Sequence, residues 1–291
     1  MAKHSAEIFA QKDVSFFGII RSMITIIIAL VASCGVFSAA HFVADWSIGW
    51  SVASAVGFFM AFQIAFGILI RKRMMNDMQA VQAILADGQK KIQAKVQRWQ
   101  MRPPGSIQAA QKEIADDTRA FVREALAETE KLSKYRLFVP MIERQKATAQ
   151  FQLNWMIKDF QRVDALMPKI IMADPNLAAM KMARMYMLKE PLEEIGKVYT
   201  KASRRLRYNQ NVAIAACYSW ILMKSGKTDE AFKVLTEALK SSDNATLMQN
   251  HTHLMNNRPT HFSNSGIGDL WYQLHLEEPK VKMQRQRAVY R

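Results

Sequence analysis

Three histidines near the C-terminus form the densest group of potential metal ligands in the sequence. His251 and His253 are separated by one residue, and His261 follows. On a helix, two side chains at this spacing point to different faces, whereas a pair four residues apart shares one face and can hold a metal ion together. No cysteine or acidic residue lies close by. We therefore predict surface or interface histidines and no metal site.

Signatures of catalysis and of cofactor binding are also missing from the sequence. The segment Gly266-Ile267-Gly268 lacks the third glycine and the preceding strand that a dinucleotide site needs. The sequence contains no phosphate-binding loop, nucleophile elbow or zinc-protease signature. It therefore predicts a protein without a cofactor, and an enzyme is the minority interpretation.

Two long apolar segments lie within the first seventy residues, at 22–44 and 48–70. At 1.5 Å per residue, each is long enough as a helix to cross a hydrocarbon core of about 30 Å. Only Asp45, Trp46 and Ser47 separate them, so the connection is a tight turn. The sequence predicts a transmembrane helical hairpin over residues 22–70.

Basic residues flank the outer ends of both segments and are absent from the turn: Lys3, Lys12 and Arg21 precede the first, and Arg71, Lys72 and Arg73 follow the second. Since positive charge is retained on the cytoplasmic side, this pattern places both termini in the cytoplasm. We expect a multi-pass protein of the cytoplasmic (inner) membrane, with residues 1–21 as a cytoplasmic N-terminal segment.

The whole chain carries 40 Lys and Arg against 25 Asp and Glu, a formal net charge of +15. Such an excess attracts polyanions. Beside a membrane anchor, anionic lipid head groups near the Arg71–Arg73 cluster explain it better than nucleic acid does. The two cysteines, Cys34 and Cys217, lie in different predicted regions and provide no disulfide framework, as suits a reducing cytoplasm.

Polar residues inside the apolar segments leave other functions open. His41 and Gln63 are of the type found in transport pathways. We expect His41 near the outer interface and Gln63 bonded across the hairpin. Val31-Ala32-Ser33-Cys34 is similar to the cleavage box of a lipoprotein signal, which would make Cys34 a lipidated N-terminus. The hairpin is favoured because the apolar run continues past Cys34 and a second segment follows.

Small residues let two helix backbones approach closely in lipid. The hairpin segments carry several, and we expect them to form its inner seam: Gly35, Ala39, Ser51, Ala55 and Gly57.

Residues 71–143 predict two juxtamembrane amphipathic helices. The first continues the second apolar segment, with a stripe at spacings of three and four: Met74, Met78, Val81, Leu85, Gly88, Ile92, Val96 and Trp99. Pro103-Pro104-Gly105 ends it, and Ser106 is a candidate cap for the second. The second has a weaker stripe: Ile107, Ile114, Phe121, Ala125 and Leu132. The two helices can fold back on each other or pair between subunits.

An internal periodicity occupies residues 144–245. Within Ala213–Ala245, the positions Ala231, Leu235 and Ala238 are spaced four and three. The same spacing occurs 36 residues earlier at Ile195, Tyr199 and Ala202, and another 32 earlier at Val163, Met167 and Ile170. This region resembles tetratricopeptide repeats, whose period is about 34 residues. Phe151 and Asn154 in the first unit, and Asp243 in the last, depart from the family pattern.

The resemblance implies a short α-solenoid whose first helices line a groove for a peptide or a partner helix. Carried over by position, the partner-binding residues would be Gln152, Trp155, Met156, Met180, Arg184, Met187, Leu188, Trp220, Met223 and Lys224. The alternative is that these methionines and tryptophans are simply core. Residues 246–278 are expected to cap the array, with a short helix at Gly268–Leu274, and residues 279–291 form a basic tail.

The sequence as a whole predicts an all-α protein, because it is poor in β-branched runs outside the apolar segments. The layout indicates a membrane-anchored cytoplasmic scaffold or adaptor that binds a protein partner through tetratricopeptide-like repeats. One alternative is an accessory structural subunit of a multi-protein membrane machine in secretion, pilus or envelope assembly; a membrane-tethered enzyme is less favoured. Whether the chain is a homo-oligomer or part of a larger membrane complex is left open.

Overall fold

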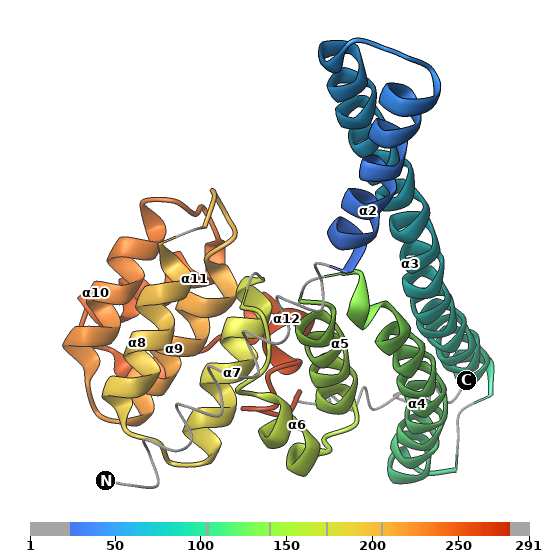
Figure 1. Ribbon diagram of the computed structural model, residues 1–291. Coiled ribbons are helices and arrows are strands. Elements are labelled where there is room, and N and C mark those ends of the chain that lie inside the picture. Colours follow the sequence, from blue (N-terminus) through green and yellow to red (C-terminus); the bar gives the residue numbers. More distant parts are fainter. Residues whose placement is uncertain (1–23, 103–104, 140, 173, 205, 280–291) are drawn as a thin grey trace, which may run out of the picture. The chain divides into compact units, whose positions relative to one another are not determined.

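The computed structural model describes residues 24–102, 105–139, 141–172, 174–204 and 206–279, and every regular element within these ranges is a helix (Figure 1). The chain divides into two compact units, Met1–Ile171 and Met172–Arg291. We call them the N-terminal and the C-terminal unit and describe each by itself. The all-α prediction is confirmed for the described residues.

The N-terminal unit begins with α2 (Ile24–Ser38), the π-helical turn η1 (Ala39–Val43) and α3 (Ile48–Met101). The stretch Thr25–Val43 and helix α3 are each long and apolar enough to cross a membrane. No residue of the most apolar part of α3 is buried inside the protein. A core helix of a soluble protein would bury most of these side chains, whereas here the described part of the chain leaves them uncovered.

The connection between α2 and α3 is held by short-range hydrogen bonds. The His41 ring nitrogen Nδ1 lies 3.2 Å from the Trp46 carbonyl oxygen, and the Ser51 hydroxyl donates to the Ser47 carbonyl oxygen at 3.1 Å. Further along, the Gln63 side chain donates a long bond of 3.5 Å to the Thr25 carbonyl oxygen, across the hairpin as expected. Both polar residues therefore serve the hairpin itself.

The seam of the hairpin differs from the sequence prediction. Ser51 is buried, but the other small buried residues are Ala29 and Ser33 on α2. Gly35 and Gly57, which we expected at the seam, are exposed, and a β-carbon at either would meet nothing within 4 Å. The prediction was wrong there because small residues occur on several faces of both helices, and their positions alone do not select the contacting face.

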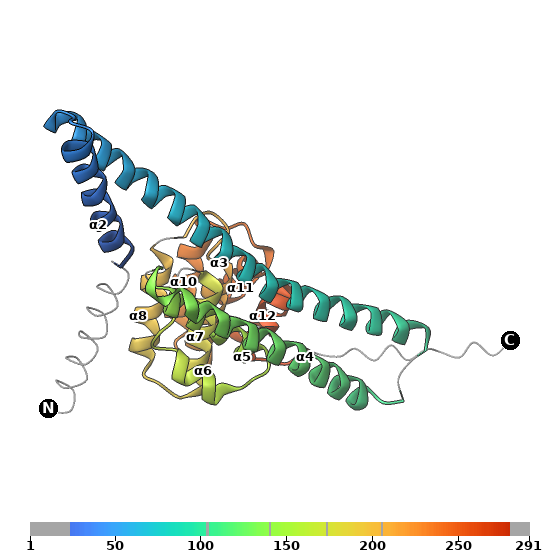
Figure 2. The same cartoon turned by 45° about the vertical axis from the view of Figure 1, so that its right-hand side comes forward.

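Helix α3 continues without interruption to Met101, and α4 (Ile107–Glu130) folds back along it (Figure 2). The predicted cap is confirmed, because the Ser106 hydroxyl accepts a hydrogen bond from the Ala109 amide at 3.1 Å. Of the two pairings that the sequence left open, the chain adopts the hairpin. Lys95 on α3 forms ion pairs with Glu113 and Asp117 on α4.

Helices α3 and α4 approach each other closely at Gly88, where a β-carbon would overlap the ring of Phe121. Around this contact lies an apolar cluster that includes Val81, Val122 and Ala125, and Leu153 joins it from helix α5 (Ile142–Met156). Glycine thus permits the two long helices to pack at this level.

A second cluster follows at the 3-10 helix η2 (Lys131–Leu137). There the Tyr135 hydroxyl donates to Asp77 on α3 at 2.7 Å, and the Lys134 ammonium lies 2.8 Å from the same carboxylate. Burial alone would raise the pKa of Asp77, but the hydrogen bonds from Lys134 and Tyr135 outweigh it and hold the pKa below its ordinary value. Asp77 therefore remains ionised and ties η2 to α3.

The N-terminal unit closes with α6 (Phe160–Leu166). The first predicted repeat placed Val163, Met167 and Ile170 on one helix, but α6 ends at Leu166. The reason is Pro168, which has no amide N–H to donate and so cannot continue the helical hydrogen bonding. Ile170 is buried although it lies outside the helix.

The C-terminal unit consists of consecutive helices: α7 (Pro175–Met187), α8 (Leu192–Ser203), α9 (Val212–Lys224), α10 (Thr228–Leu239), α11 (Ala245–Met255), the 3-10 turns η3 (Pro259–His261) and η4 (Ser265–Ile267), and α12 (Asp269–Tyr272). Helix α9 is central: α7, α8, α10 and α12 all pack against it. From Val212 to Leu222 only Tyr218 is not buried. The aligned positions Ala231, Leu235 and Ala238 of α10 are buried as well.

The Gly88–Phe121 contact leads to a prediction on stability. We expect Gly88→Leu to destabilise the N-terminal unit by about 1–3 kcal/mol, because the larger side chain forces the helices apart. The measurement is thermal unfolding of the full chain in mild detergent, followed by circular dichroism. The control is Ala86→Leu, at an exposed position two residues earlier on the same helix, which should leave the unfolding midpoint unchanged. An unchanged midpoint for Gly88→Leu would contradict the described packing.

Candidate functional site

The ten residues predicted to bind a partner are divided between the two units. Gln152, Trp155 and Met156 lie on α5 in the N-terminal unit, and the other seven lie on or at the ends of α7 and α9 in the C-terminal unit. Each group is therefore described within its own unit.

On α5, the large aromatic residue belongs to the interior. Trp155 is 1% exposed, stacks on Phe151 with ring centroids 6.1 Å apart, and contacts the edge of Phe160 at 5.6 Å. Met156 is exposed and Gln152 is half-buried. Trp155 is therefore a core residue, which was the alternative to a position in the groove. Its ring is not accessible to a partner in this structure.

On α9, Trp220 is also buried, and what covers it is the C-terminal segment of the chain itself. Its ring contacts Tyr186 at 5.4 Å and Trp271 of α12 at 5.7 Å between centroids. The indole N–H groups of Trp220 and Trp271 donate to the two oxygens of the Glu277 carboxylate, at 2.8 Å and 2.9 Å. One carboxylate therefore joins two tryptophans that lie far apart in the sequence.

The remaining predicted residues of the C-terminal unit keep part of their surface. Leu188 and Lys224 are exposed, and the Lys224 ammonium lies 5.2 Å from the centre of the Trp220 ring. Arg184 approaches the sulfur of Met187 at 4.0 Å. The half-buried members are Met180, Arg184, Met187 and Met223.

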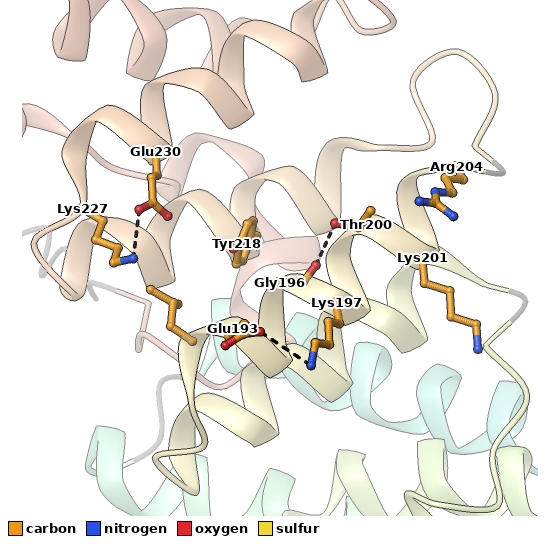
Figure 3. Close-up of a pocket in the computed structure, with 10 residues that line it drawn as sticks. Glu193, Gly196, Lys197, Thr200, Lys201, Arg204, Tyr218, Lys227 and Glu230 are labelled. Atoms are coloured by element: carbon orange, nitrogen blue, oxygen red, sulfur yellow. Dashed lines mark hydrogen bonds and ion pairs between the residues drawn. The ribbon is translucent and has the colours of Figure 1, made fainter.

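A groove that the sequence did not predict lies on another part of this unit. It measures about 960 Å³ and runs along one face of α8, over Tyr218 of α9, to the start of α10 (Figure 3). The face of α8 is formed by residues three or four apart, which include Gly196, Lys197, Thr200 and Lys201. Lys227 and Glu230 line the end at α10.

The floor of the groove is set by a close contact between a glycine and a tyrosine. A β-carbon at position 196 would lie 2.7 Å from the Tyr218 hydroxyl, so only glycine admits the phenol there without a shift. The Tyr218 ring stacks on Tyr199 with centroids 4.6 Å apart. Burial raises the pKa of Tyr218, and it raises the pKa of Tyr199 to about 12. Both phenols are therefore protonated at neutral pH, and the Tyr218 hydroxyl can donate a hydrogen bond.

The charges of the groove are divided between its two ends. Lys197 pairs with Glu194 at 2.6 Å, and Lys227 pairs with Glu230 at 2.9 Å. Lys201 and Arg204 line the other end, and neither forms an ion pair within the described part of the chain. That end of the groove carries two uncompensated positive charges and therefore favours a negatively charged ligand.

Sequence reasoning missed this groove, although a signal was present. Gly196 lies in a helix whose other groove-lining residues, apart from Leu192 at its start, are polar or charged. The glycine marks a place where the surface is hollowed, but which neighbouring side chain fills the space depends on the packing of α8 against α9.

The histidines pack with ordinary partners. His251 stacks on Phe232 at 4.5 Å and lies 3.0 Å from the Thr236 hydroxyl. His253 stacks on His261 at 5.5 Å. Within the described ranges there is no group of three or more side chains suited to hold a metal ion.

Comparison with known proteins finds no matching family model, no similar curated protein and no similar solved structure. The functional argument therefore depends on the geometry of the chain itself.

The double contact of Glu277 can be tested by substitution. Glu277→Gln keeps the size of the side chain but turns one acceptor into an amide donor, which faces an indole N–H that is then left unpaired. We expect the free energy of unfolding to fall by about 1–3 kcal/mol, and limited proteolysis to cut the segment after Gly268 faster. Glu278→Gln, at the exposed neighbouring position, should change neither measurement. Equal behaviour of the two variants would show that the carboxylate does not hold the segment.

Proposed function

We propose that this protein is a membrane-anchored cytoplasmic adaptor whose C-terminal unit binds an acidic segment of a protein partner. In this proposal residues 22–70 form the transmembrane hairpin, both termini are cytoplasmic, and the host is the cytoplasmic (inner) membrane. The exposed apolar surfaces of α2 and of the first half of α3 support the anchor. The basic residues beyond both segments support the orientation.

The tetratricopeptide-like reading of the helices is part of the proposal. Helix pairs α7/α8 and α9/α10 occupy the two stretches that the periodicity assigned to the middle and last units. The small residues Ala183 and Ser219, at the position where the family has a small side chain, are both fully buried. Buried small residues at equivalent places in successive helix pairs support a repeated packing arrangement.

The observation that carries the binding proposal is the groove beside α8, with two unpaired cations at one end and a phenol that can donate at its centre. A carboxylate of an extended peptide would pair with Lys201 and Arg204, while a carbonyl oxygen would accept from the Tyr218 hydroxyl. We favour this surface over the face predicted from the repeats because Trp220 is covered by α12 and Glu277.

The proposed topology can be tested with reporter fusions. Reporters placed after Arg73 and at Arg291 should both give a cytoplasmic signal, and one inserted at Asp45 the opposite signal, because the basic flanks stay inside. A C-terminal fusion that reports the other side of the membrane would contradict the orientation and would favour the lipoprotein alternative.

The binding surface can be tested by photo-crosslinking in cells. A photo-crosslinking residue at Thr200 should capture one main protein, through a peptide rich in aspartate and glutamate. The double variant Lys201→Glu, Arg204→Glu should reduce this crosslink at least tenfold, since reversal of two contacting charges costs more than about 1.4 kcal/mol.

The control is Lys233→Glu, which changes an exposed charge on α10 that does not line the groove. A crosslinked peptide without acidic residues, or a crosslink that survives the double reversal, would refute the groove as the partner site. Circular dichroism of the same preparations checks that the variants are folded.

A further inference from the structure

The N-terminal unit contains a smaller cavity that the adaptor function does not use. It measures about 310 Å³ and lies between the start of α2, the stretch of α3 from Gln63 to Met74, and the end of η2. This stretch of α3 is where the apolar segment ends and the Arg71–Arg73 cluster begins. The cavity therefore lies where hydrocarbon would give way to lipid head groups.

The walls of the cavity are mainly apolar. Phe66 and Phe138 meet edge to face with centroids 5.6 Å apart, so the end of η2 packs against α3 at this level. Ile70 and Met74 continue the wall along α3 and join the cluster around Tyr135. Gly67 also lines the cavity, and a β-carbon there would meet nothing within 4 Å, so the space beside it is open.

Among the described residues, one charged residue lines this cavity. Arg71 is exposed at its edge and forms no ion pair with any described residue, whereas the neighbouring Lys72 and Arg73 do not line the cavity. A guanidinium group can bind two phosphate oxygens at once in a planar arrangement. The cavity thus combines a mainly apolar interior with a phosphate-binding group at its edge.

We propose that this cavity binds one acyl chain of an anionic glycerophospholipid, with the lipid phosphate held by Arg71. The inference rests on the proposed membrane position of the hairpin. It goes beyond a general attraction of lipids to the basic cluster, because it assigns one arginine and one glycine to a defined site. A lipid bound there fills the gap between α3 and the end of η2 and so fixes the inner end of the hairpin.

The test uses the full chain in nanodiscs that contain phosphatidylglycerol and phosphatidylcholine with the same acyl chains. After transfer into detergent, native mass spectrometry counts the lipids that remain bound. The wild type should retain one phosphatidylglycerol with at least a tenfold preference over phosphatidylcholine. Gly67→Leu, which fills the open space, should lose both lipids. Arg71→Gln should retain a lipid but lose the preference between head groups.

Two matched variants serve as controls. Gly57→Leu adds the same side chain to an exposed, open position of α3 outside the cavity, and Arg73→Gln removes a charge that does not line it. Both should behave like the wild type. Unchanged retention in Gly67→Leu would overturn the site, and an equal loss of preference in Arg71→Gln and Arg73→Gln would reduce it to general charge attraction. If deletion of residues 1–20 raises lipid retention, the chain's own N-terminal segment occupies the cavity and the proposal fails.

Carbonate extraction of cell membranes that contain the wild-type chain separates this inference from the proposed function. A wild-type chain that is extracted as a peripheral protein would refute the anchor. A chain that stays in the membrane but retains no lipid would refute only the lipid site.

Discussion

The unbroken hydrogen bonding of α3 is the constraint on which the N-terminal unit depends. The helix runs from Ile48 to Met101 without a proline, and each backbone group inside it is satisfied by its own turn. That property lets one segment serve two environments, since its first part exposes apolar side chains and its second part carries a stripe that packs on α4. The ion pairs of Lys95 and the bond from Tyr135 to Asp77 then attach α4 and η2 along its length.

In the C-terminal unit the equivalent role belongs to the close packing around α9. Ala215, Ala216 and Ser219 are small and buried, so the neighbouring helices approach closely on several sides. The Asn264 side chain donates to the Ala216 carbonyl oxygen at 2.9 Å, and Glu277 accepts from Trp220. The segment after α11 is thus attached to α9 by polar bonds as well as by Trp271. Specific side-chain contacts thus hold the segment that was expected to cap the helical array.

The periodicity of the sequence predicted the positions of the helices, but it did not predict which of their side chains are buried by other parts of the chain. The apolar segments, the Ser106 cap and the positions of the helix pairs all follow from local sequence, because each depends on residues only a few positions apart. Whether Trp155 and Trp220 faced a groove or a core did not follow, since the answer depends on Phe160 and on Glu277, which is 57 residues from Trp220. The groove over Tyr218 needed the same long-range knowledge. Gly67 and Gly88 both lie inside α3, yet Gly67 borders open space and Gly88 touches Phe121.

The continuity of α3 also fixes an angular relation along the chain. Because each residue of an α-helix turns by about 100°, the face that meets α2 and the face that meets α4 keep one set phase. A single residue inserted near Arg73 would rotate everything beyond it, including the contact between α3 and α4, by that angle relative to the face that meets α2, whereas seven inserted residues would restore the phase to within about 20°. The length of this segment is therefore free to vary only in steps of whole turns.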